Sequence, residues 1–140
     1  MIVADTSGLL ALFNRKEPAH APVARAVAAT SQILAVSPFV VAEIDYLAAT
    51  RLGAEAELAI VRELAGGAYE HPRLADDDLR VCAEILERYH DQEIGIADAS
   101  LVVLAHRYGT RDILTLDRRH FDVLRPLDGG HFTLIPTGAG

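Results

Sequence analysis

The sequence predicts a single α/β domain, a three-layer α/β/α sandwich around a mostly parallel central sheet. First, 140 residues suit one hydrophobic core and leave no room for a second of useful size. Second, 51% of the residues are apolar and 24% are charged, which is the balance of a folded globular chain. Third, short apolar runs alternate with segments of helical periodicity, and strands separated by helices favour a parallel sheet covered on both faces.

Capping signals define the elements of the first half. After the first apolar run, Thr6 or Ser7 can cap a helix directly. Ser37 and Pro38 provide an N-cap and a first-turn proline for a later helix, which Gly53 ends. The predicted elements are a strand over residues 2–5, helices over 6–14 and 18–30, a strand over 33–36, and helices over 38–51 and 54–64.

The second half continues the same alternation. Three aspartates at residues 76–78 open a helix, where acidic groups complement the helix dipole, and Gly109 stops the next one. We expect residues 1–136 to form the domain and residues 137–140 to be a flexible tail. The predicted elements are a strand over 68–71, helices over 76–90 and 96–108, and strands over 113–116 and 132–135.

Four acidic residues stand at positions where such a fold places its ligands. Asp5 and Asp117 end predicted strands, and the ligand crevice of a parallel sheet lies beyond the carboxyl ends of its strands. Glu43 and Asp98 lie on predicted helices with apolar neighbours one turn away, so we expect both to face the core side. Each acid alone is compatible with a helix cap, an ion pair or a turn, but together the four can converge on one crevice.

Convergence of these acids predicts a metal site. Clustered carboxylates repel one another, and Mg²⁺ or Mn²⁺, which prefer oxygen ligands, would let all four ionise. Nucleophilic catalysis is disfavoured because the chain lacks a credible Ser/His/Asp or Cys/His set, and its six histidines are too scattered for zinc. The predicted metal ligands and catalytic residues are Asp5, Glu43, Asp98 and Asp117.

The charge balance does not by itself favour a nucleic-acid substrate. A net charge of −7 opposes binding of a polyanion, although bound divalent cations would cancel the charge of the acidic cluster locally. Four arginines crowd around Asp117, and they fit a phosphate-binding surface and an ordinary solvated face equally well. These arginines are Arg107, Arg111, Arg118 and Arg119.

Four segments carry a resemblance to a known family. The chain contains, in this order, IVADTSGLLALF, VSPFVVAEIDYLAATRLG, IGIADASLVVLAHRYG and ILTLDRRHF. They resemble the PIN-domain ribonucleases, in particular the VapC toxins of bacterial VapBC toxin–antitoxin pairs. The resemblance implies a PIN-like fold and hydrolysis of phosphodiester bonds in structured RNA, either tRNA or 23S rRNA. It also implies Mg²⁺ as cofactor, with Mn²⁺ as a substitute, bound by the four acids.

The same resemblance extends to RNA contacts and partners. His120 departs from the pattern, because many relatives carry an aspartate there. The expected RNA-binding residues are Thr6, Ser7, Arg15, Lys16, Thr115, Arg118, Arg119 and His120. We expect a VapB-type antitoxin whose C-terminal segment crosses the active-site groove. Apolar residues on the helices at 38–51 and 54–64 fit two interpretations equally well, ordinary core packing and a homodimer, the latter forming a heterotetramer or larger assembly with the antitoxin. These residues are Leu47, Leu58, Ile60, Val61 and Leu64.

Other functions fit the sequence less well. A receiver domain needs a second acid beside Asp5 and a late lysine, but the only lysine is Lys16. A haloacid-dehalogenase-like phosphatase needs an aspartate where Ser7 stands, and the chain lacks the length of a DNA-threading nuclease. A non-catalytic binding module on the PIN scaffold remains the alternative. Without an apolar run of membrane-spanning length or a leader, the expected location is the cytoplasm.

Overall fold

The computed structural model describes residues 1–137 and has a parallel sheet at its centre. The sheet has four strands in the order β2-β1-β3-β4, and every neighbouring pair is parallel. The strands are β1 (Ile2–Ala4), β2 (Leu34–Ala35), β3 (Asp112–Leu114) and β4 (Thr133–Ile135). The predicted parallel α/β architecture is therefore confirmed. Of the tail expected at 137–140, residues 138–140 lie outside the described residues.

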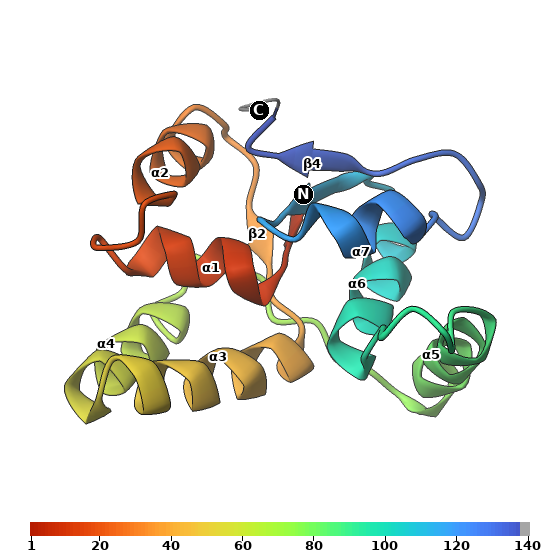
Figure 1. The fold of residues 1–140 in the computed structure, drawn as a ribbon, viewed down its shortest axis with the longest axis horizontal. Helices are drawn as coiled ribbons and strands as arrows, with labels where there is room; N and C mark the ends of the chain where they lie inside the picture. The colour runs from red at the N-terminus through yellow and green to blue at the C-terminus, as the bar shows by residue number, and fades with distance from the viewer. Residues whose placement is uncertain (138–140) are drawn as a thin grey trace.

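Helices flank the sheet, with α1 to α4 to its left and α5 and α6 to its right in Figure 1. They are α1 (Thr6–Phe13), α2 (His20–Ala28), α3 (Pro38–Arg51), α4 (Ala54–Leu64), α5 (Asp76–Arg88), α6 (Ile96–Arg107) and α7 (Arg118–Val123). Six of them match the predicted helices to within two residues at each end. Among residues 1–137, no helix combines the length and apolarity needed to cross a membrane.

Three local predictions need correction. The helix α7 was not predicted, and it starts at the N-cap Asp117, whose Oδ1 accepts from the backbone N–H of His120 at 3.3 Å. The expected strand over 68–71 contributes only an isolated bridge between Ala35 and Glu70, because β2 offers just two residues for pairing. The N-cap of α1 is Asp5 and not Thr6 or Ser7, and its side chain makes no capping bond.

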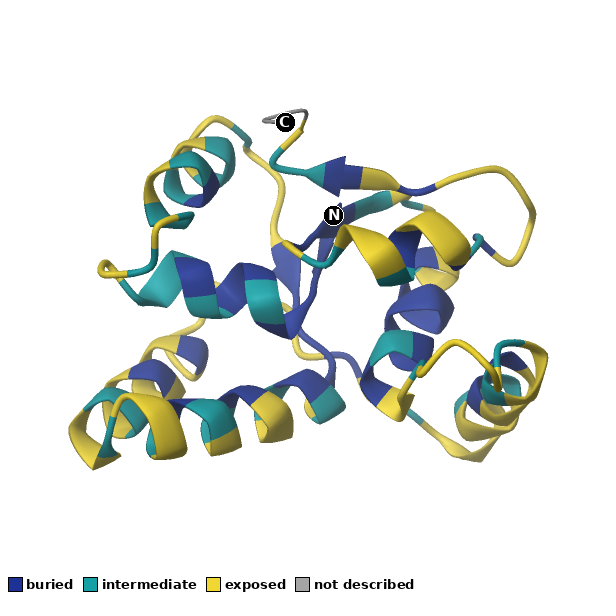
Figure 2. Cartoon of the chain, in the orientation of Figure 1, coloured by how far each residue is buried: buried dark blue, intermediate teal, exposed yellow. Residues whose placement is uncertain are grey.

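The most buried helix, α6, is covered along most of its length (Figure 2). Its middle is apolar all round, which is typical of a helix covered on every side. The hydroxyls of Ser37 and Ser100 lie 2.8 Å apart in the core and join the start of α3 to α6. The two helices that carry Glu43 and Asp98 are therefore fixed to each other close to these acids.

The close approach of α1 to β3 depends on Gly8. A Cβ atom at this position would lie 2.5 Å from the carbonyl oxygen of Leu114, which is far inside van der Waals contact. A residue without a side chain lets the helix rest on the strand backbone. As a result, Asp5 and Ser7 at the start of α1 come next to Thr115 at the end of β3.

Candidate active site

One cavity of about 760 Å³ brings the four predicted acids together. Asp5 and Asp117 follow the ends of β1 and β3, Asp98 lies in the first turn of α6, and Glu43 lies in the middle of α3. The cavity thus opens at the carboxyl edge of the sheet, where parallel α/β folds bind their ligands.

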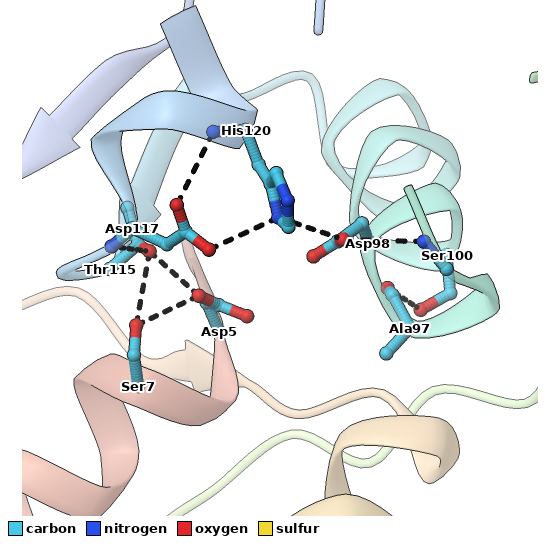
Figure 3. Close-up of polar contacts among 9 residues, drawn as sticks. Asp5, Ser7, Ala97, Asp98, Ser100, Thr115, Asp117 and His120 are labelled. Carbon is cyan, nitrogen blue, oxygen red and sulfur yellow. Dashed lines mark hydrogen bonds and ion pairs between the residues drawn. The ribbon is translucent and has the colours of Figure 1, made fainter. Parts of the chain in front are cut away.

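Asp5 is the most buried of the four acids, with 5% of the residue exposed. Its Oδ2 accepts hydrogen bonds from the hydroxyls of Thr115 at 2.7 Å and Ser7 at 2.9 Å (Figure 3). Burial raises the pKa of Asp5, and the two hydroxyl donors act in the opposite direction. Thr115 also accepts from the backbone N–H of Asp117 at 2.9 Å. The carboxylate is consequently held in one orientation by the first turn of α1 and by the residue that follows β3.

Asp98 and Asp117 face each other across the ring of His120. The Nδ1 atom of His120 lies 3.2 Å from Oδ2 of Asp98 and 3.1 Å from Oδ2 of Asp117. Burial, followed by the negative charge of Asp5, raises the pKa of Asp98 to about 6, while His120 lowers it. A carboxyl group in this state is close to half-ionised at a mildly acid pH, and a nearby cation would ionise it fully.

Glu43 lines the same cavity but is exposed, so the prediction that it faces the core was wrong. The buried stripe of α3 is formed by Val40, Ile44 and Ala48, a spacing of four residues. Glu43 precedes Ile44, and one residue corresponds to a turn of about 100° around the helix. Its carboxylate therefore stands at the solvent side of the cavity and not within the core.

The expected RNA contacts divide into three groups. Thr6, Ser7 and His120 line the cavity, and Thr115 supports it through its bond to Asp5. The second group, Arg118 and Arg119, lines an adjoining hollow that shares Ser7, Leu116 and Asp117 with the cavity. The third group, Arg15 and Lys16, is exposed beyond the end of α1 and lines neither hollow.

Sequence reasoning missed several residues of the cavity wall. Glu17 and Glu93 add two carboxylates, and Arg51 adds one cation. Glu93 has a φ of 56°, a left-handed conformation that is uncommon for a non-glycine residue. No local pattern marks these positions, because each reaches the cavity only through the path of the loop or helix that carries it.

Known proteins resemble this chain in sequence and in fold. Residues 2–125 match the PIN domain family. The chain belongs to this family. The PIN domain is 56% identical over 135 residues to Ribonuclease VapC26 of Mycobacterium tuberculosis (strain ATCC 25618 / H37Rv), covering 96% of this chain and 100% of that protein. The resemblance to VapC ribonucleases that the four sequence segments indicated is therefore confirmed.

Two solved structures share the fold of this PIN domain. Mycobacterium tuberculosis VapC20, described as a sarcin-ricin loop cleaving toxin, gives a TM-score of 0.79 at 22% identity, covering 86% of this chain and 92% of that chain. FitAcB from Neisseria gonorrhoeae gives a TM-score of 0.63 at 20% identity, covering 95% of this chain and 97% of that chain. At these identities the similarity shows the fold alone.

The walls of the cavity fit a hard divalent cation in the kind of donor that they offer. The cavity is lined by six carboxylates and by two basic residues, Arg51 and His120. Mg²⁺ and Mn²⁺ prefer oxygen ligands such as these carboxylates. The buried hydroxyl of Thr6 has no hydrogen-bond partner within residues 1–137, so its oxygen is available as a further metal ligand. In the present side-chain arrangement, no three acidic, histidine or cysteine groups of the described chain are spaced to share one ion.

Proposed function

We propose that this PIN domain is a Mg²⁺-dependent endoribonuclease, the toxin of a VapBC toxin–antitoxin pair, with Mn²⁺ as a substitute metal. The observation that carries the proposal is the meeting of four carboxylates from four separate elements in one cavity. The relationship to a protein named as a ribonuclease supports it. The proposed metal ligands are Asp5, Glu43, Asp98 and Asp117.

The residues of the cavity support a hydrolytic mechanism. A bound divalent ion supplies an activated water and stabilises charge on the phosphate. Asp5 is held in place by two hydroxyls, so the orientation of its carboxylate in the cavity wall is fixed. Asp98 ionises more readily beside a cation than alone, because burial and the charge of Asp5 are what raise its pKa. The products would carry 5′-phosphate and 3′-hydroxyl ends.

The proposed substrate is a structured RNA, tRNA or 23S rRNA, cut to inhibit translation and growth in the cytoplasm. Thr6, Ser7 and His120 are placed to contact the nucleotide at the cavity, while Arg118 and Arg119 are placed to contact the neighbouring backbone. Recognition of such RNA depends on its shape and on unpaired nucleotides more than on a short sequence.

The proposed regulator is a cognate VapB-type antitoxin whose C-terminal segment covers the cavity. We also propose a homodimer through α3 and α4, where large apolar side chains are exposed: Tyr46 at 66%, Leu58 at 49% and Val61 at 39%. Ile60 and Leu64, which were expected to belong to this surface, are buried in the core instead. Pairing two such faces would bury this surface. Two toxin chains with their antitoxins then form a heterotetramer or a larger assembly. A strictly monomeric mass by light scattering, well above micromolar concentration, would refute the dimer.

The experiment is cleavage of total cellular RNA, with the new 5′ ends mapped by sequencing. The wild-type chain and Asp98→Asn are each assayed with Mg²⁺, with Mn²⁺ and with chelator. The exposed Asp91→Asn, which leaves the cavity intact, is the matched control. Discrete metal-dependent cuts made by wild type and control, but lost in Asp98→Asn, are the expected result. No cuts from folded, antitoxin-free protein would favour a non-catalytic binding module.

A further inference from the structure

The ring of His120 occupies the space between two of the proposed metal ligands. One ring nitrogen, Nδ1, faces Oδ2 of Asp98 and Oδ2 of Asp117 at nearly equal distances of 3.2 and 3.1 Å (Figure 3). An unprotonated ring nitrogen and an ionised carboxylate are both acceptors. The two contacts are ion pairs when the ring is protonated.

The position of the ring is fixed by the helix that carries it. The backbone N–H of His120 is bonded to the side chain of the N-cap Asp117 at 3.3 Å. The next residue, Phe121, is buried and packs edge-on against Phe132 with ring centroids 6.1 Å apart. With one neighbour anchored in the core and the helix start closed by Asp117, the side chain of His120 is directed into the cavity.

We propose that His120 is a positioning residue that holds Asp98 and Asp117 together in the metal-free chain and competes with the metal ion for their Oδ2 atoms. The inference rests on the proposed function, because it assumes that these two acids bind metal. Two facing carboxylates repel each other, and an N–H between them offsets that repulsion. A metal ion needs the same oxygen lone pairs, so the ring must leave at least one carboxylate before the ion can bind.

Three roles for His120 predict different effects of its removal on metal affinity. A competing residue weakens metal binding, so its removal tightens binding. A metal ligand strengthens binding, so its removal weakens it. A residue that only supports the fold leaves the affinity unchanged once the variant is shown to be folded. The sign of the change therefore separates competition from both other roles.

The experiment is titration of the purified full chain with Mn²⁺ by isothermal calorimetry, without RNA. We expect His120→Ala to lower the Mn²⁺ dissociation constant about tenfold, because the loss of one contact to a charged metal ligand changes an equilibrium constant by about that factor. We expect His120→Asn, which restores an N–H near the position of Nδ1, to return most of the way to wild type. His131→Ala, an exposed histidine outside the cavity, is the control and should not change the affinity.

The melting temperature of the metal-free protein gives a second measurement. Loss of the contacts between His120 and the two carboxylates should lower the melting temperature, and the rise produced by Mn²⁺ should be larger in His120→Ala than in wild type. If His120→Ala does not fold, His120→Phe keeps a ring without the N–H and serves the same comparison. An unchanged or weaker Mn²⁺ affinity in the folded variant overturns the inference about His120 but does not contradict the proposed nuclease function. A wild-type chain that binds no Mn²⁺ overturns the metal site itself, and the inference with it.

Discussion

Replacement of Asp98 by asparagine should stabilise the metal-free chain at neutral pH. The pKa of this carboxyl is raised from 3.8 to about 6, first by burial and then by the charge of Asp5. The folded chain therefore retains a proton that the unfolded chain has released, so stability is lost as pH rises from about 4 to about 6. At about 1.4 kcal/mol per pH unit, the loss is at most about 3 kcal/mol. Asparagine is neutral at every pH and avoids it.

The assay is urea denaturation in chelator at pH 4 and pH 7.5. We expect Asp98→Asn and wild type to be equally stable at pH 4 and the variant to be more stable, by up to about 3 kcal/mol, at pH 7.5. The exposed Asp91→Asn should show no such difference. Added Mg²⁺ should stabilise wild type more than the variant. A difference in stability that is the same at both pH values, or a variant that is less stable than wild type at pH 7.5, would refute this reasoning.

Three further predictions follow from the packing and charge around the cavity. Thr115→Val removes the hydroxyl that donates to Asp5 at 2.7 Å, and kcat/KM for metal-dependent RNA cleavage should fall at least tenfold while the circular dichroism spectrum is retained. Gly8→Ala should lower the free energy of unfolding, measured by urea denaturation, by about 1–3 kcal/mol or more, because the new Cβ meets the Leu114 backbone. The control is Gly95→Ala, whose Cβ meets nothing within 4 Å, and it should lower the free energy of unfolding by less than about 1 kcal/mol. Neutralising Arg118 and Arg119 at the start of α7 should make RNA binding less dependent on salt concentration. The slope of log affinity against log salt should fall by about 0.7 for each phosphate that these arginines neutralise in the wild-type complex. An unchanged slope would exclude both arginines as RNA contacts.

Those arginines should matter more than the two basic residues beyond the end of α1. Ser7 at the start of α1 lines the hollow formed with Arg118 and Arg119. Arg15 lies past the other end of this eight-residue helix, which at 1.5 Å per residue is about 12 Å long. Variants of the two pairs, compared at several salt concentrations, would show which side of the cavity the RNA backbone follows.

Local signals account for the parts of the fold that the sequence could predict. Ser37 and Pro38 set the start of α3, and Gly53, with a φ of 98°, follows its end. The helix α7 has a capping residue, Asp117, at its start, but its two arginines and its six-residue length are typical of an exposed loop. It is stabilised by burial of Phe121 against Phe132, a contact that no local pattern contains.

The site shows the same division between local and distant information. The convergence of the four acids on one cavity could be predicted from strand ends and helix positions. The bond from Thr115 to Asp5 joins residues 110 positions apart, so it depends on the pairing of β1 with β3. The outward direction of Glu43 depends on which stripe of α3 packs inward. Both facts require the tertiary structure.

The net charge of −7 raises the question of how an RNA phosphate enters a cavity with six carboxylates in its wall. Arg51 and His120 are too few to neutralise these acids, and at short range like charges in a partly desolvated site repel strongly. In the proposed mechanism, a divalent ion therefore assists the binding of the RNA as well as its hydrolysis. For this reason chelation should weaken the binding of a non-cleavable RNA, and not only slow the cleavage of a natural one. Binding that chelator leaves unchanged would mean that the RNA backbone is held away from the acids, at the arginines of α7.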